Sequence, residues 1–121
     1  MPMYRQHLYG QGVQLWCAPT VDAREIWATS MRHIAYEGRC FVLSACQTLG
    51  KKDWPAGVDG GEIDGRSWVV SPMGEVIAGG GAGERLEFAD IDLGDISRGK
   101  FDLDVAGHYS RPDVFSLRVK S

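Results

Sequence analysis

The strongest constraint on the fold is a stripe of apolar residues between positions 22 and 37. Its members recur at steps of three and four and so lie on one face of a helix: Ala23, Ile26, Trp27, Met31, Ile34 and Ala35. Asp22 and Glu25 have the spacing of a capping box, in which each side chain accepts from the other residue's backbone N–H. The pattern therefore predicts a helix over 22–37, ended by Gly38 in the left-handed conformation.

Two extended segments flank this helix. Residues 13–18 alternate in polarity and end at Pro19, which is typical of a strand that opens into a loop. Residues 39–45 form a continuous apolar run, too short for a second long helix, which predicts a strand buried on both faces. In a chain of 121 residues, these elements predict a single domain over 1–121 of the α/β (α+β) class.

Weaker patterns fill the rest of the chain. Ser71-Pro72-Met73-Gly74 supplies the turn of a hairpin between 68–70 and 75–78. Other segments predict a short helix over 3–11, a strand over 85–91 with one exposed face, a weakly helical stretch over 93–105 and an extended one over 115–119. Residues 50–66 are rich in Lys, Asp, Pro and Gly, which indicates a variable surface loop.

Charge and hydropathy exclude several classes of partner. Thirteen Lys and Arg against sixteen Asp and Glu give a net charge of −3, so we expect no nucleic-acid partner. The sequence has no apolar stretch near the ~20 residues that cross a bilayer and no secretory leader, so we expect no membrane contact and a cytoplasmic location. Three cysteines without a CxxC spacing predict reduced thiols rather than disulfides.

No complete catalytic or cofactor motif is present. The glycines of 79–83 resemble a phosphate loop, but a strand pattern follows them instead of a helix, which favours a plain hairpin connection. His7, His33 and His108 lack a second ligand at short spacing, so we expect no metal and no cofactor. Cys46 has no neighbouring base that would activate it as a nucleophile.

Several blocks of the chain nevertheless resemble one family. They are Ala18-Pro19-Thr20-Val21-Asp22-Ala23-Arg24-Glu25-Ile26-Trp27, His33-Ile34-Ala35-Tyr36-Glu37-Gly38, Phe41-Val42-Leu43-Ser44-Ala45, Ser71-Pro72-Met73-Gly74, Ala89-Asp90-Ile91-Asp92-Leu93 and Gly107-His108-Tyr109-Ser110-Arg111-Pro112-Asp113-Val114-Phe115. In this order they are similar to blocks of the nitrilases of the carbon–nitrogen hydrolase superfamily. The resemblance covers nearly the whole chain and is weakest over 51–66 and the glycine cluster.

The resemblance implies half of a four-layer α-β-β-α sandwich, completed by dimerisation or by a missing N-terminal half. Nitrilases hydrolyse nitriles or amides with a Cys nucleophile, a Glu base and a Lys. The resemblance aligns this chain with the C-terminal half that follows the nucleophile, which implies a truncated chain without these catalytic residues. We therefore expect no activity from the chain alone. The alternatives are a non-catalytic interaction module and one subunit of a split nitrilase.

The resemblance also implies roles for individual residues. The substrate-pocket candidates are Pro19, Thr20, Cys46 and Gln47, where family members often carry Asn in place of Cys46. The interface candidates for a homodimer are Tyr4, Leu8, Arg24, Trp27 and Met31. The residues with structural roles are Asp22 and Glu25 as caps, with His108, Arg111 and Asp113 in the C-terminal segment, where Arg111 and Asp113 form an ion pair or cap around Pro112.

Overall fold

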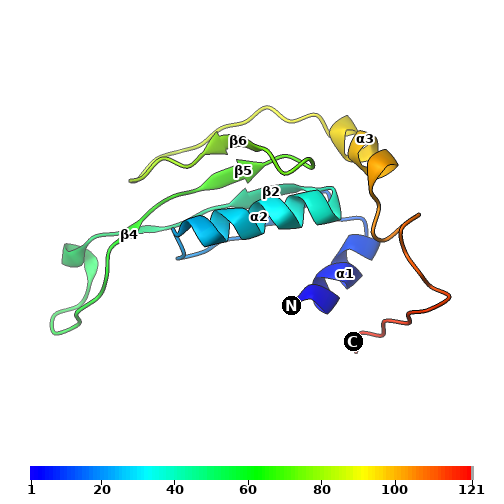
Figure 1. The fold of residues 1–121 in the computed structure, drawn as a ribbon. Coiled ribbons are helices and arrows are strands. Elements are labelled where there is room, and N and C mark those ends of the chain that lie inside the picture. The colour runs from blue at the N-terminus through cyan, green and yellow to red at the C-terminus, as the bar shows by residue number, and fades with distance from the viewer. Residues whose placement is uncertain (121) are drawn as a thin grey trace.

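The computed structural model describes residues 1–120, which form a four-stranded sheet with a long helix on one face (Figure 1). The helices are α1 (Pro2–Gly10), α2 (Glu25–Gly38), α3 (Gly94–Asp102) and a short 3-10 turn, η1 (Lys51–Asp53). The strands are β1 (Leu15–Cys17), β2 (Phe41–Ser44), β3 (Thr48–Leu49), β4 (Ile63–Asp64), β5 (Trp68–Val70) and β6 (Val76–Gly79). No helix among these residues is both long and apolar enough to cross a membrane.

The order of the main sheet is β1-β2-β5-β6. β1 and β2 run parallel because α2 connects them, with Trp16 opposite Val42. β2 and β5 are antiparallel, with Leu43 opposite Val69, and β5 and β6 form the predicted hairpin around Ser71–Gly74. The carboxyl ends of β1 and β2 therefore lie at the same edge of the sheet, which is where loops gather in an α/β fold.

The core lies between α2 and the sheet. Met31 and Ala35, from the predicted helical stripe, pack against Val42 and Val70 of the two central strands. Met31 is 3% exposed and Val42 and Val70 are fully buried. Burial of apolar surface at this single layer contact is the main stabilising term that the described residues show.

The opposite face of the sheet is apolar and only partly covered. Phe41 is buried beneath the segment that carries Phe88, whereas the Leu15 side chain is 48% exposed and the Leu43 side chain 37%. The predicted burial of 39–45 on both faces is therefore wrong for Leu43. The reason is that α2 covers one face and no second layer covers the other among residues 1–120.

Helix α2 begins three residues later than the capping box predicts. Its N-terminal flanking residue is Arg24, and no side chain caps it. Asp22 instead accepts from the Arg24 backbone N–H at 3.0 Å and from the Arg24 guanidinium at 2.9 and 2.6 Å. The carboxylate is thus occupied by Arg24, and the predicted pairing of Asp22 with Glu25 is wrong.

The end of α2 also differs from the prediction. Gly38 is the last helical residue, and Arg39 takes the left-handed conformation with φ of 47°. Gly38 is still required for a steric reason, because a Cβ there would lie 2.3 Å from the Tyr9 ring. The glycine therefore makes room for α1 rather than for the turn.

The predicted strand over 85–91 is wrong, because the structure has no strand in that segment. Residues 115–119, predicted only to be extended, belong to no helix or strand. Residues 85–91 alternate in polarity, but no neighbouring strand offers them hydrogen bonds within the described chain, and Leu86 and Phe88 are largely exposed. Within the glycine cluster 79–83, Gly79 is the last residue of β6, and residues 80–83 are consequently a loop and not a hairpin connection. The helices α1 and α3 confirm the predictions over 3–11 and 93–105.

The predicted loop over 50–66 contains regular structure at its base. β3 and β4 pair antiparallel, with Thr48 opposite Asp64, and η1 follows β3. Trp54 anchors the tip by donating from Nε1 to the Gly61 carbonyl at 2.9 Å. The resulting arm projects beyond the sheet at the end opposite α1 and α3 (Figure 1).

Candidate functional site

The candidate site is the loop cluster beyond the carboxyl ends of β1 and β2. Thr20 and Cys46 form an isolated parallel bridge there. The Thr20 N–H donates to the Ala45 carbonyl at 2.9 Å, and the Gln47 N–H donates to the Thr20 carbonyl at 3.3 Å. The structure thus brings together three of the predicted pocket residues, Thr20, Cys46 and Gln47.

Ser67, the residue before β5, supports this bridge. The Cys46 N–H donates to Ser67 Oγ at 3.0 Å, and Ser67 directly precedes β5. Thr20 Oγ1 accepts from the Asp22 N–H at 2.9 Å, which closes a tight turn after the bridge. Pro19 lies in the same loop with its ring exposed. The backbone of the site is therefore fixed by both neighbouring strands.

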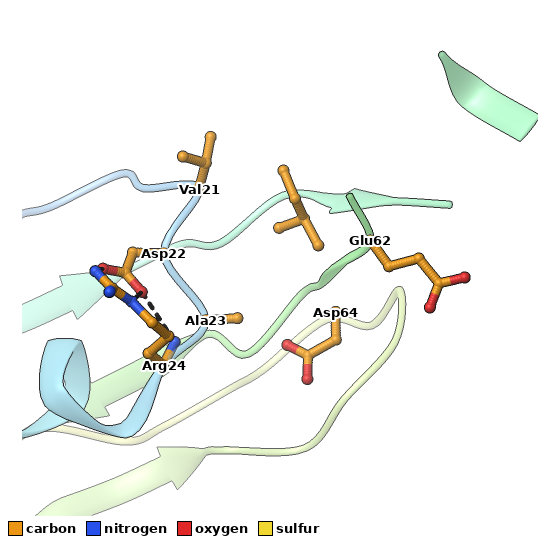
Figure 2. A pocket seen from close by; sticks show the side chains of 7 residues that line it. Val21, Asp22, Ala23, Arg24, Glu62 and Asp64 are labelled. Atoms are coloured by element: carbon orange, nitrogen blue, oxygen red, sulfur yellow. Dashed lines mark hydrogen bonds and ion pairs between the residues drawn. The ribbon is translucent and has the colours of Figure 1, made fainter. Parts of the chain in front are cut away.

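One hollow beside the bridge is lined by three acidic residues, one arginine and three apolar residues (Figure 2). Its volume is about 630 Å³. Asp22 and Arg24 lie together on one side of it, and the Glu62 side chain on the other side points away from them (Figure 2). The hydrogen bonds and charge of Arg24 hold the pKa of Asp22 down to about 2. Asp64 Oδ2 accepts from Arg66 Nε at 2.9 Å, while Asp64 Oδ1 is buried without a partner among residues 1–120.

A second hollow, of about 510 Å³, lies on the other side of the bridge. Cys46 and Gln47 line one wall, and Glu84 and Arg85 line the other. Gly65, with φ of +75°, also lines this hollow, and a Cβ there would lie 2.1 Å from Thr48 Oγ1 and 2.9 Å from the Gly83 carbonyl. The hollow thus has one carboxylate and one guanidinium among the side chains that line it.

The buried thiols are poorly suited to nucleophilic attack. Burial raises the pKa of Cys46, and the carboxylates of Asp64 and Asp22 raise it further. Burial also raises the pKa of Cys40 to about 11, and that residue lies in the core under α2. A thiolate nucleophile needs the opposite environment, with a nearby cation and some exposure. Cys17 is exposed on the uncovered sheet face, away from the bridge.

The interface candidates fall into two groups. Tyr4 is about half exposed on α1, Leu8 is half-buried there, and Arg24 is exposed but paired with Asp22. Met31 is buried in the core, and Trp27 donates from Nε1 to Ser44 Oγ at 2.8 Å. Met31 is therefore not available for contact with a second copy of the chain, because the helical stripe to which it belongs faces the sheet.

The remaining candidates have short-range contacts. The rings of His108 and Tyr109 lie with their centroids 4.9 Å apart and their planes tilted by 58°, and Arg111 pairs with Asp113 at 2.8 and 2.6 Å. Glu25 lies in the first turn of α2, where its charge favours the helix dipole. Among residues 1–120 no three His, Cys, Asp or Glu side chains are grouped so that they could hold a metal ion.

The sequence reasoning missed two groups that organise the fold. Ser67 is hidden in a loop pattern, and nothing in its sequence context predicts that it supports Cys46. Arg39 is fully buried, and its position within an apolar run was the available signal, because a charge in such a run needs partners.

Comparisons with known proteins show which family this chain belongs to. A family model described as carbon–nitrogen hydrolase matches residues 1–101. An aliphatic nitrilase from Sinorhizobium fredii is 51% identical over 98% of this chain, and an arylacetonitrilase from Trametes versicolor is 49% identical over 99% of it. The chain spans only 42% and 41% of the lengths of these two relatives. The crystal structure of the Caenorhabditis elegans NitFhit protein superposes with a TM-score of 0.78 and 28% identity, over 99% of this chain and 28% of that one.

Proposed function

Because this chain belongs to the carbon–nitrogen hydrolase family, we propose that it forms one part of a nitrilase that hydrolyses the carbon–nitrogen bond of a nitrile. The observation that carries the proposal is the match to curated nitrilases at about 50% identity over 98% or more of the chain. An amide is the second candidate substrate, since the matching family model covers carbon–nitrogen hydrolases as a class.

The apolar sheet face supports an assembly larger than these residues. Leu15 and Leu43 lie on the face opposite α2 and are 48% and 37% exposed. A sheet in water normally buries one face or the other, and this sheet has apolar residues on both. We propose that a second α-β layer, from the missing part of the fold, packs on this face to complete a four-layer sandwich.

The catalytic groups would come from that second layer. The reaction requires a thiolate that attacks the nitrile carbon, an acid that protonates the nitrogen, and a base that activates two waters in turn. The first water adds to the thioimidate so that ammonia leaves, and the second hydrolyses the resulting thioester to the carboxylic acid and the free thiol. The buried thiols of Cys40 and Cys46 have raised pKa values, which does not suit the first step. In this proposal Thr20, Cys46 and Gln47 shape the substrate pocket without reacting.

Two further arrangements use the same surfaces. A second chain that carries the catalytic groups would make this protein one subunit of a split nitrilase, again through the uncovered sheet face. Pairing of two copies through the exposed part of α1, where Tyr4 lies, would add a homodimer. If neither partner supplies catalytic groups, the chain acts as an interaction module derived from a nitrilase.

Complementation tests the proposal. The purified chain is assayed for ammonia release from aliphatic and aryl nitriles, alone and mixed with the portion of the Sinorhizobium fredii nitrilase that it does not match. We expect no release from the chain alone and release from the mixture. The control is Cys46→Ala in the chain, which should leave the mixture active. Turnover by the chain alone that disappears in Cys46→Ala would contradict the proposal.

A further inference from the structure

Arg39 is a charged residue at the centre of three elements. It follows the last residue of α2, and its side chain is fully buried. Its Nη2 donates to Asp102 Oδ2 of α3 at 2.6 Å, and its Nη1 donates to the Pro72 carbonyl in the β5–β6 turn at 3.2 Å. The guanidinium also lies 4.1 Å from the ring centroid of Tyr36, in α2. The single side chain therefore joins α2, the turn and α3.

Helix α3 rests directly on this arginine. Gly99 faces Arg39, and a Cβ at position 99 would lie 3.0 Å from Arg39 Cδ and 3.7 Å from Met73 Sδ. Of the nine residues of α3, only Ile96 and Gly99 are buried, so little apolar contact holds the helix in place. The close approach at Gly99 is the condition for the ion pair between Arg39 and Asp102.

The position of Asp102 has no explanation within α3 itself. An acidic residue at the last position of a helix is unfavourable for the helix dipole, which prefers a cation there. Asp102 is nevertheless the carboxylate that neutralises Arg39, although its own side chain is 64% exposed. The charge of Asp102 thus stabilises the contact between α3 and Arg39, and it does not stabilise the helix α3 itself.

We propose that Arg39 and Asp102 form a latch that holds α3, together with the segment 103–120, against the rest of the fold. When the latch opens, α3 and this segment undock as one unit while α2 and the sheet stay folded. The segment follows α3 because, among residues 1–120, one hydrogen bond joins it to the elements outside α3, from Gln6 Nε2 of α1 to the Val105 carbonyl at 3.0 Å, beside an open hollow that it shares with α1. This inference is independent of the proposed catalytic function.

Hydrogen–deuterium exchange on the full chain tests the latch. In Asp102→Ala, we expect peptides from 94–115 to exchange roughly tenfold faster or more, because a charge-assisted hydrogen bond to a buried group is lost. Peptides from α2 and β2 should keep their rates. Unchanged exchange in 94–115, or an equal acceleration in β2, would overturn the proposal.

A matched control lies in the same helix. Arg98→Ala removes the ion pairs with Asp92 at 2.7 Å and with Asp95 at 2.5 Å, but both pairs lie on the surface. We expect exchange in 94–115 to stay within about twofold of the wild-type chain, as is usual for exposed pairs. An acceleration equal to that of Asp102→Ala would mean that α3's own stability, and not the latch, sets its docking, and would overturn the proposal.

A second variant opens the latch without changing charge. In Gly99→Leu, the new side chain would occupy the space of Arg39 Cδ. Leucine favours helix more than glycine, so helix propensity alone predicts slower exchange in α3. The latch predicts faster exchange in 94–115, and a slower rate there would overturn it.

Discussion

Thr20 and Cys46 form a β-bridge just beyond the carboxyl ends of β1 and β2, and Ser67, the residue before β5, accepts a hydrogen bond from Cys46. The Cys46 N–H, which donates to Ser67 Oγ, belongs to a residue that is only 8% exposed. A buried backbone donor without a partner is costly, so the Cys46 position of the loop cluster depends on this one hydroxyl.

Ser67→Ala should lower the free energy of unfolding by about 1–3 kcal/mol, because it leaves the Cys46 N–H without an acceptor. Urea denaturation followed by tryptophan fluorescence measures the change. Ser30→Ala is the control: Ser30 Oγ donates to the Ile26 carbonyl on the exposed side of α2, and we expect a change of less than about 0.5 kcal/mol. Equal effects of the two substitutions would refute the role of Ser67.

Met31→Ala tests the contact between α2 and the sheet. Met31 is 3% exposed, and its removal leaves a cavity against Val42 and Val70, so we expect a loss of about 2–5 kcal/mol. Met3→Ala, at a side chain that is 67% exposed, makes the same chemical change on the surface and should cost less than about 0.5 kcal/mol. Thermal unfolding by circular dichroism compares the two variants.

Glu37 should make the docking of α1 sensitive to acid. Burial alone would raise its pKa, but hydrogen bonds from Arg5 at 2.8 Å and Tyr9 at 3.0 Å outweigh burial and hold the pKa below its ordinary value of 4.5. A carboxyl with a lowered pKa contributes stability above its ordinary pKa and loses it as the pH falls through the folded value. The contribution of Glu37 is therefore present at neutral pH and lost below about pH 4.5.

The measurement compares urea midpoints between pH 7 and pH 3 for three proteins. Glu37→Gln should be less stable than the wild-type chain at pH 7, and the difference should shrink as the pH falls. Glu75→Gln, at an exposed residue of the β5–β6 turn region, should track the wild-type chain at every pH. A difference between Glu37→Gln and the wild-type chain that stays constant with pH would show that the charge of Glu37 does not hold α1.

Local patterns predicted the helices and the hairpin because their signals are carried by neighbouring residues. The stripe with Met31 and Ala35 fixes which face of α2 is buried, and Pro72 with Gly74 fixes the turn. The start of α2 could not be read in this way. Asp22 meets the spacing of a cap, but its carboxylate is taken by the Arg24 guanidinium, and spacing does not reveal such competition.

Structural features that depend on partners far away in the sequence were harder to predict from local patterns. Residues 85–91 alternate as a strand does, yet a strand also needs a free edge to pair with, and the pattern carries no information about that edge. The candidate site was accessible in part, because Thr20 and Gln47 follow two neighbouring strands and the resemblance placed both in a pocket. The hydrogen bond from the Cys46 N–H to Ser67 Oγ could not be predicted, because it joins residues 21 positions apart through one hydroxyl.

The last prediction tests the uncovered sheet face as a binding surface for the rest of the fold. Leu15 lies opposite Phe41 on the edge strand β1 and is 48% exposed, so Leu15→Lys should cost the isolated chain less than about 1 kcal/mol. In the complemented nitrilase the same lysine would be buried without a partner between two sheets, and ammonia release should fall by roughly 100-fold or more.

Val58→Lys is the control for this prediction, because Val58 is 51% exposed on the projecting arm and away from the sheet. It introduces the same charge at a similar exposure and should leave complementation within about twofold of the wild-type chain. Stability of each chain is measured first by urea denaturation, so that a loss of activity is assigned to assembly and not to unfolding. If Leu15→Lys complements as well as Val58→Lys, the uncovered face is not where the missing layer packs.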